Sequence, residues 1–265
     1  MTIRNDMKTT AAPTFVTRLA QSPQDRRAAQ RLRYEVFIAE LGGDGPLVDH
    51  AARLEVDRFD AFADHILLLD TARPQNDQVV GVYRVMTAEM AQAAGRFYCA
   101  EEYDLTPFMR SGMRLLELGR SCLHAQYRGG AAMAHLWAGL ADYVAERQID
   151  LLFGVASFHG TDVAALSAPL SLLHHRYLAR EALRVKAIGP TALSMAIEDA
   201  DTLDRVAAVR EMPALIKAYL RLGATVGEGA FVDYDFNTVD ICVILERAAV
   251  QGLQHKFLQK GAARG

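Results

Sequence analysis

Charged side chains stand in several segments whose other residues are mostly apolar. Glu117 and Arg120 lie in a run of leucines and small residues. Arg84 lies in a run of valines, and Arg33 lies in a helix-like segment. A carboxylate can accept a proton from a substrate, and an arginine can bind a carboxylate through two parallel hydrogen bonds. One such charge is usually half of a surface ion pair, but four together favour a polar site.

Two further groups of polar residues could complete such a site. Asp57 and Asp60 are three residues apart and could bind one cation together, or they could cap a loop or pair with a nearby arginine. Ser157, His159 and Asp162 follow an apolar run. They could line a substrate site, or they could form an ordinary polar turn after a strand.

A loop rich in small residues precedes a long helical pattern. It contains Gln126, Arg128, Gly129, Gly130 and Ala131. Small residues let the backbone approach a ligand closely, and the free N–H groups at a helix start attract phosphate. A glycine-containing helix start without any ligand gives the same short pattern.

The elements that would position these residues alternate between strands and helices. This order predicts one α/β domain over residues 13–248 with a single sheet of mixed direction. The expected strands are 14–20, 65–70, 79–86, 113–123, 151–158, 230–236 and 239–246, and the expected helices are 23–41, 89–95, 129–148, 162–183 and 213–223.

Local patterns mark some boundaries better than others. Ser22 and Pro23 form a capping residue followed by a proline, which predicts a helix start. Pro169 is expected to disturb the first half of the helix over 162–183. In the expected strand over 113–123, the alternation of apolar and polar residues does not place Glu117 and Arg120 cleanly on one face.

Composition narrows the class of protein. The chain has 265 residues, is 51% hydrophobic and carries a net charge of −3, which argues against a dedicated nucleic-acid-binding protein. We see no membrane span and no secretory signal, and three scattered cysteines suggest reduced thiols, so we expect a cytoplasmic location. Residues 1–12 are expected to be flexible, and residues 249–265 form a polar basic tail.

No metal or permanently bound cofactor is expected. His174 and His175 are neighbours on a predicted helix, so their side chains point about 100° apart and cannot easily share one metal ion.

Several motifs resemble those of known acyltransferases. The pattern Gln126-x-x-Gly129-x-Ala131 resembles the loop of GNAT acyltransferases that holds the phosphate end of a pantetheine arm. The resemblance implies a mixed, mostly antiparallel sheet with helices on both faces. It also implies that strands 113–123 and 151–158 splay apart around a thioester, which meets a backbone N–H of the first strand.

The charged residues resemble those of acyl-homoserine lactone synthases in order and type. These are Arg33-x-x-x-Phe37, Asp57-x-x-Asp60, Arg84 and Glu117-x-x-Arg120. Longer segments, among them RLRYEVFIAELG, LELGRSCLHAQYRGG and YLRLGATVGEGAFVDYDFNTVD, are similar to the ornithine N-acyltransferases of ornithine-lipid synthesis.

The closer resemblance implies a reaction. A fatty acyl group, with or without a 3-hydroxyl, passes from acyl carrier protein, or from acyl-CoA, to the α-amine of L-ornithine, giving lyso-ornithine lipid. The acyl-phosphopantetheine is then a donor and not a resident cofactor. Acyl carrier protein and ornithine are the implied partners, with a peripheral contact to the inner membrane surface because the product is a lipid.

The resemblance also implies roles for the charged residues. Glu117 is either the general base or an ion-pair partner that orients Arg120 or Arg84. Arg120 and Arg84, and next Arg33, are expected to bind the carboxylate of the amino acid, near Phe37. Asp57 and Asp60 would bind the side-chain ammonium, and Ser157, His159 and Asp162 would line the acceptor site.

Carrier protein is acidic, so a basic surface is expected near the pantetheine entrance. Residues that could contribute to it, or that could each lie on an ordinary solvated helix face, are Arg128, His174, His175, Arg176, Arg180 and Arg184. Cys122 is expected to belong to the core, since direct transfer needs no acyl-enzyme.

Two other functions fit the same patterns. One is a signal synthase of the acyl-homoserine lactone type, which would release methylthioadenosine. The other is a non-catalytic GNAT-like module that binds acyl carrier protein.

Overall fold

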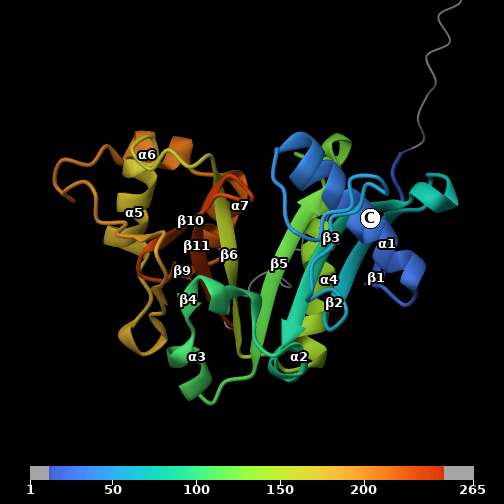
Figure 1. Cartoon of the computed structure of the whole chain (residues 1–265), viewed down its shortest axis with the longest axis horizontal. Coiled ribbons are helices and arrows are strands. Elements are labelled where there is room, and N and C mark those ends of the chain that lie inside the picture. The colour runs from blue at the N-terminus through green and yellow to red at the C-terminus, as the bar shows by residue number, and fades with distance from the viewer. Residues whose placement is uncertain (1–11, 248–265) are drawn as a thin grey trace, which may run out of the picture.

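The computed structural model describes residues 12–247 (Figure 1). Residues 1–11 of the predicted flexible segment 1–12, and all of the predicted basic tail 249–265, therefore lie outside the described residues.

One mixed sheet forms the centre of the fold. Its strand order is β1-β2-β3-β5-β6-β11-β10-β8, with β9 also pairing with β11, and all pairs are antiparallel except β5 with β6. The strands are β1 (Phe15–Leu19), β2 (Asp64–Asp70), β3 (Val79–Thr87), β5 (Leu115–Leu123), β6 (Leu151–His159), β8 (Ala192–Leu193), β9 (Thr225–Val226), β10 (Ala230–Asp233) and β11 (Thr238–Glu246). A separate pair joins β4 (Tyr103–Asp104) to β7 (Lys186–Ala187). The predicted fold class is confirmed.

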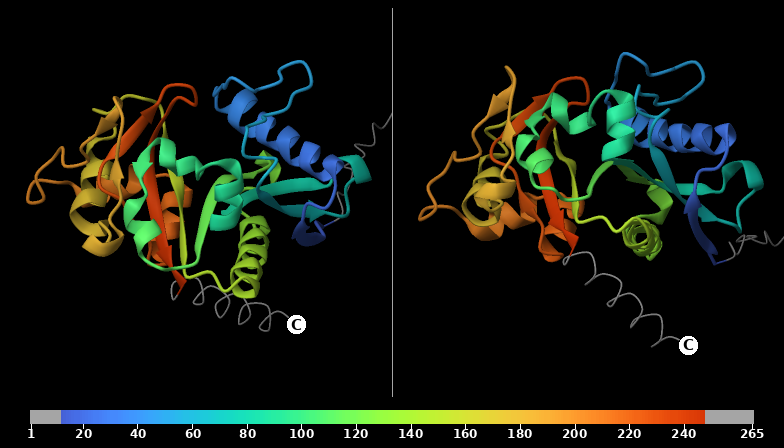
Figure 2. Two further views of the ribbon diagram at one scale, coloured as in Figure 1. Left: turned by 60° about the horizontal axis from the view of Figure 1, so that its bottom comes forward. Right: turned by 90° about the horizontal axis from the view of Figure 1, so that it is seen from below.

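Helices cover both faces of this sheet, as Figure 2 shows. The α-helices are α1 (Pro23–Arg33), α2 (Ala88–Ala94), α3 (Thr106–Arg110), α4 (Ala132–Glu146), α5 (Ser167–Tyr177), α6 (Arg205–Glu211) and α7 (Ala214–Arg221). Leu32 of α1 packs with Leu67 and Val82 on one face, whereas Leu136 of α4 packs with Leu68 on the other. Alternate residues of the central strands therefore point to opposite faces of the sheet and pack into two different cores.

The first helix begins as predicted but changes form halfway. The Ser22 hydroxyl accepts the Asp25 N–H at 3.1 Å, and Pro23 occupies the first turn. After Arg33 the chain continues as a π-helix, Tyr34–Glu40, and not as the uninterrupted α-helix that was expected. π-Helical turns are often found at functional sites, and this one carries Phe37.

Two other helices differ from their predicted bounds. α4 starts at Ala132, because Gly129 has a positive φ of 75° and the chain turns there before the helix begins. α5 spans only Ser167–Tyr177. Pro169 lies in its first turn, where a missing N–H costs no hydrogen bond, so it does not disturb the helix as predicted.

β5 and β6 diverge in the middle of the sheet. They pair only from Leu115–Leu151 to Glu117–Phe153, as the GNAT resemblance implied. At the divergence, a Cβ on Gly154 would lie 2.1 Å from the Leu118 carbonyl oxygen, so only glycine fits there. On its other edge β5 bulges where Tyr83 faces both Arg120 and Ser121, and Arg120 has a φ of 50°.

Within residues 12–247, every helix is too short or too polar to cross a lipid bilayer. Cys99, Cys122 and Cys242 are buried and unpaired, as expected for reduced thiols.

Candidate active site

A cavity of about 510 Å³ opens between the diverging strands. Its apolar wall comes from α4 and α7 and includes Met133, Trp137, Leu215, Ala218 and Tyr219. Its polar wall comes from β5, β6, β10 and β11 and includes Arg120, Ser157, His159, Asp233 and Asp240. The volume is typical of a small-molecule site.

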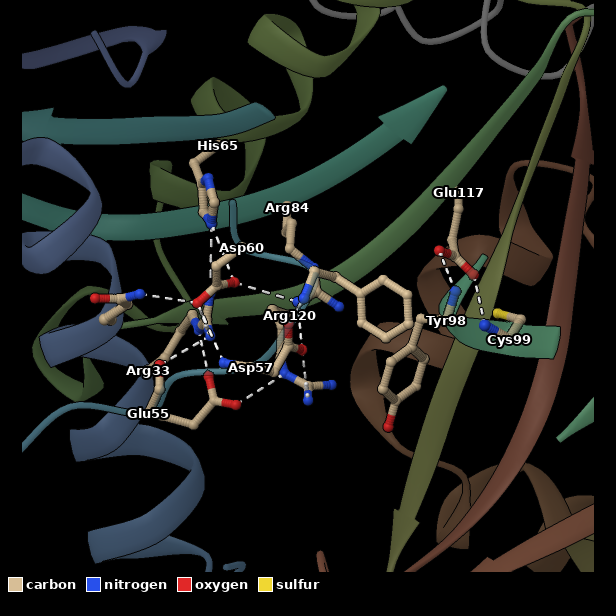
Figure 3. Close-up of polar contacts among 12 residues, drawn as sticks. Arg33, Glu55, Asp57, Asp60, His65, Arg84, Tyr98, Cys99, Glu117 and Arg120 are labelled. Carbon is tan, nitrogen blue, oxygen red and sulfur yellow. Dashed lines mark hydrogen bonds and ion pairs between the residues drawn. The ribbon is translucent and has the colours of Figure 1, made fainter. Parts of the chain in front are cut away.

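A buried ion network lies beside the polar wall (Figure 3). At its centre is Arg33, whose side chain is 0% exposed. Its Nη1 donates to Asp60 Oδ1 at 2.7 Å, its Nη2 donates to the Glu55 carbonyl oxygen at 2.8 Å, and its Nε pairs with the Glu55 carboxylate. Arg33 is therefore fully occupied by protein groups and does not reach the cavity.

Two more arginines complete the network. Arg84 pairs with Asp57 and, at 3.2 Å, with Asp60. Arg120 Nε lies 3.1 Å from Glu55 Oε1, and its Nη2 lies 3.1 Å from Asp57 Oδ2. Three arginines thus face three carboxylates.

The network is electrically balanced. Burial opposes ionisation of Asp60, but the His65 hydrogen bond and the Arg33 charge hold its pKa below its ordinary value. Burial likewise opposes ionisation of Asp57, but Arg84 and Arg120 lower its pKa. Because both carboxylates are already paired with arginines, this geometry does not favour Asp57 and Asp60 as ligands of a substrate ammonium.

Arg120 is the arginine of this network that reaches the cavity. Its side chain is 11% exposed, against 3% for Arg84. The guanidinium carbon lies 4.8 Å from the centre of the Tyr98 ring and 4.9 Å from that of Phe236, so the two rings hold it in place. Arg120 can therefore meet a substrate carboxylate.

Glu117 occupies a different position from the one expected. Its oxygens accept the backbone N–H groups of Tyr98 at 2.9 Å and Cys99 at 2.6 Å, at the start of a 3₁₀ turn (Figure 3). It pairs with neither Arg84 nor Arg120, and it does not line the cavity. Burial raises its pKa, although those N–H groups oppose the effect. The geometry supports neither direct proton abstraction nor an ion pair with an arginine.

The loop before α4 lies at the edge of the cavity. Arg128 and Gly129 line it, while Gln126, Gly130 and Ala131 lie beside them in sequence. The first turn of α4 has no side-chain cap and no acidic residue, so its N–H groups are free to meet an anion. Arg128 itself pairs with Glu40, with Nη2 2.7 Å from Oε2, and so ties the loop to the π-helix.

Other predicted site residues divide into two groups. Phe37, Ser157 and His159 line the cavity, as expected for an acceptor site. Asp162 instead accepts the Ala164 N–H at 3.1 Å, which makes it part of a polar turn. Cys122 borders the cavity, but burial raises its pKa to about 12, so it stays a neutral thiol.

The expected basic surface does not gather at the cavity. Arg180 pairs with Glu246, the last residue of β11, at 3.2 Å. The cavity lies at the opposite end of that strand, at Thr238 and Asp240. Eight residues of strand separate the two ends by roughly 25 Å. Of the six residues in the predicted set, Arg128 is the one that lines the cavity.

An acidic cluster that sequence reasoning missed borders the cavity. It consists of Glu102, Asp233 and Asp240, whose carboxylates each place one oxygen within 4.8 Å of the other two. Among residues 12–247, this is the group of side chains whose spacing could hold a metal ion. Asp240 interrupts the apolar strand β11, the same signal that drew attention to Arg84. Glu55, two residues before Asp57, was also missed although it binds two of the arginines.

Replacing Asp240 with asparagine is expected to raise the free energy of unfolding at pH 8 by up to about 3 kcal/mol. Burial and the Asp233 charge raise the pKa of Asp240 from 3.8 to about 6, although the hydroxyls of Ser157 and Thr238 and the Arg120 charge oppose them. Each pKa unit corresponds to about 1.4 kcal/mol. Because the unfolded chain ionises more readily, the carboxylate destabilises the fold above pH 6, and this penalty fades as the pH falls towards 4.

Urea unfolding of both proteins at pH 8 and pH 5 measures this difference. The variant should gain clearly more at pH 8 than at pH 5. An equal gain, or none at pH 8, would show that the Asp240 charge does not oppose folding.

Known proteins resemble this chain in sequence and in fold. Residues 32–138 match the family described as "Acetyltransferase (GNAT) domain". The chain is 54% identical over 250 residues to the L-ornithine N(alpha)-acyltransferase of Rhodobacter capsulatus, covering 93% of this chain and 96% of that one. It is 41% identical over 232 residues to the protein of the same name from Brucella abortus, covering 86% and 83%.

A solved structure shares the fold. This is the structure of BjaI, a CoA-dependent acyl-homoserine lactone synthase, with SAM and isopentyl-CoA. It superimposes on this chain with a TM-score of 0.53, and the two sequences are 12% identical. The match covers 92% of this chain and 90% of that chain, and at this identity it concerns the fold alone.

Proposed function

Because this chain belongs to the L-ornithine N(alpha)-acyltransferase family of GNAT proteins, we propose that it transfers a 3-hydroxy fatty acyl group to the α-amine of L-ornithine. The donor is acyl carrier protein and the product is lyso-ornithine lipid. The observation that carries the proposal is the cavity between β5 and β6, which has an apolar wall on one side and Arg120 on the other.

The donor side suits an acyl-phosphopantetheine arm. The apolar wall of α4 and α7 can bury an acyl chain, at about 0.8 kcal/mol for each methylene. Tyr83, Ser121 and Trp137 line the cavity, and their polar groups could offer hydrogen bonds to the amides of the arm. The N–H groups of the first turn of α4 would meet its phosphate.

The diverging strand supplies groups for the reacting carbonyl. Past Glu117, β5 no longer pairs with β6, and the bulge at Arg120 turns its backbone locally. We assign the oxyanion of the tetrahedral intermediate to a backbone N–H of this unpaired stretch. Such a donor stabilises charge that develops in the transition state.

Arg120 binds the carboxylate of the acceptor amino acid in this scheme. Arg84 and Arg33 act through it, because they hold Asp57 and Glu55, which in turn orient the Arg120 guanidinium. Glu117 is a positioning residue, since it fixes the backbone of Tyr98, whose ring packs against Arg120.

Transfer then requires one substitution at the thioester. The neutral α-amine attacks the carbonyl carbon, the new C–N bond forms, the C–S bond breaks, and the pantetheine leaves as a thiolate. The proton lost by the amine can pass to His159, a titratable group on the polar wall of the cavity, and then to the leaving thiolate. Cys122 takes no part because its thiol remains protonated.

The proposal predicts acyl-ornithine as the product of a defined assay. Purified protein is incubated with 3-hydroxyacyl carrier protein, or the matching acyl-CoA, and a panel of amino acids, and products are identified by mass spectrometry. Ornithine should be acylated fastest, and more efficiently from the carrier protein than from CoA. Release of methylthioadenosine from S-adenosylmethionine, or no transfer to any amine, would contradict the proposal.

A further inference from the structure

We infer that Glu102, Asp233 and Asp240 form a subsite that binds the distal ammonium group of a diamino acid acceptor. The inference rests on the proposed function, because it names the part of the protein that would recognise the ornithine side chain. The cluster would take the role that was expected of Asp57 and Asp60, since those two residues are paired with arginines.

Three separate elements bring these carboxylates together. Glu102 follows the 3₁₀ turn Tyr98–Glu101, Asp233 ends β10, and Asp240 lies in β11 opposite Ser157 of β6. One oxygen of each lies within 4.8 Å of the others. Asp233 and Asp240 border the cavity, so a ligand in the cavity can reach the cluster.

Two of these carboxylates lack any partner for a buried oxygen. Glu102 Oε2 and Asp240 Oδ1 have no hydrogen-bond partner among residues 12–247, and both residues are only 3% exposed. An unsatisfied buried carboxylate is costly. The nearby Arg120 contacts Glu55 and Asp57 instead. The described chain therefore supplies no cation for this cluster, and a cationic ligand would satisfy it.

The donor count favours a primary ammonium. An –NH₃⁺ group has three N–H donors, and the cluster offers one oxygen from each of three carboxylates. Mg²⁺ or Ca²⁺ takes six or more oxygen ligands, so water molecules would have to complete the coordination that these three carboxylates begin. Magnesium is therefore the comparison ligand in the test.

The position of the cluster matches a substrate with charges at both ends. Arg120 borders the same cavity and packs against Phe236, which lies three residues after Asp233 in the turn between β10 and β11. An amino acid whose carboxylate meets Arg120 can direct a cationic side chain towards Asp233 and Asp240. The subsite would thus select a diamino acid over a neutral one.

The test compares ornithine with norvaline, which has the same carbon skeleton but no side-chain amine. For the unmodified protein, kcat/KM should favour ornithine by at least 100-fold. Asp240→Asn and Asp233→Asn should each reduce this preference at least tenfold, mainly through KM for ornithine, while norvaline turnover changes by less than threefold. Asp235→Asn is the matched control, because Asp235 lies exposed in the same turn and should leave the preference unchanged.

Calorimetric titration with ornithine, norvaline and magnesium chloride separates this inference from the proposed function. Preferential ornithine binding that Asp240→Asn removes supports the subsite even if no amine is acylated. An equal loss of ornithine and norvaline turnover in Asp240→Asn would assign Asp240 to proton transfer and overturn the inference. Tighter binding of magnesium than of ornithine, or an unchanged preference in both variants, would also overturn it.

Discussion

Replacing Arg120 with methionine should lower kcat/KM for ornithine by roughly 30-fold to several thousand-fold. Truncating one partner of a buried, hydrogen-bonded charge pair costs about 2–5 kcal/mol, and every 1.4 kcal/mol is a factor of ten. Arg120 is the network arginine that reaches the cavity, and the rings of Tyr98 and Phe236 hold its guanidinium. Its loss leaves the substrate carboxylate without a cation.

Steady-state kinetics with acyl carrier protein as donor measures the effect, and circular dichroism verifies that the variant is folded. Arg120→Lys provides the charge-preserving comparison. It keeps the network neutral but loses the two-pronged geometry of the guanidinium, so its activity should fall between the unmodified protein and the methionine variant. Full activity in Arg120→Met would remove Arg120 from the site.

Replacing Arg33 with methionine should lower the free energy of unfolding by roughly 3–5 kcal/mol, since it leaves buried carboxylates uncompensated. The Arg33, Glu55 and Asp60 side chains are 0%, 1% and 4% exposed. Without Arg33, each of these carboxylates keeps a single arginine partner, Arg120 for Glu55 and Arg84 for Asp60. Activity should fall only indirectly, because Arg33 does not border the cavity.

Urea unfolding with a matched surface variant tests this expectation. Arg18→Met removes a similar pair with Asp25, in which the arginine is 35% exposed, and should cost no more than about 1 kcal/mol. If the two variants lose equal stability, the Arg33 network contributes no more than a surface ion pair.

These two arginines look alike in the sequence, and only the fold separates them. Both stand in regular segments, and both belong to the charged set that resembles acyl-homoserine lactone synthases. Arg33 meets Glu55, 22 positions away, and Arg120 meets the same residue from 65 positions away. Periodicity reports which local face a residue occupies, but it does not report which distant charge lies opposite.

The sequence by itself determined the local elements and the family motifs. Apolar runs located β2, β3, β5, β6 and β11, because strands that are buried on both faces are mostly apolar. Ser22 and Pro23 marked the start of α1, because helix capping is a local interaction. The helices α3 and α6 were not predicted, because their sequence pattern is weak. The start of α4 lies after its predicted position, because the chain turns at Gly129.

The tertiary structure alone decided how the charges are used. The turn at Tyr98 and Cys99 directs its N–H groups at Glu117, so the predicted base is occupied by backbone hydrogen bonds. Asp57 and Asp60 pair with arginines. Glu102 and Asp240, in contrast, each have an oxygen near the cavity that has no hydrogen-bond partner among residues 12–247. The reason is physical: a charge is satisfied by whatever the fold brings within hydrogen-bond distance, and that depends on strands and turns far apart in the chain.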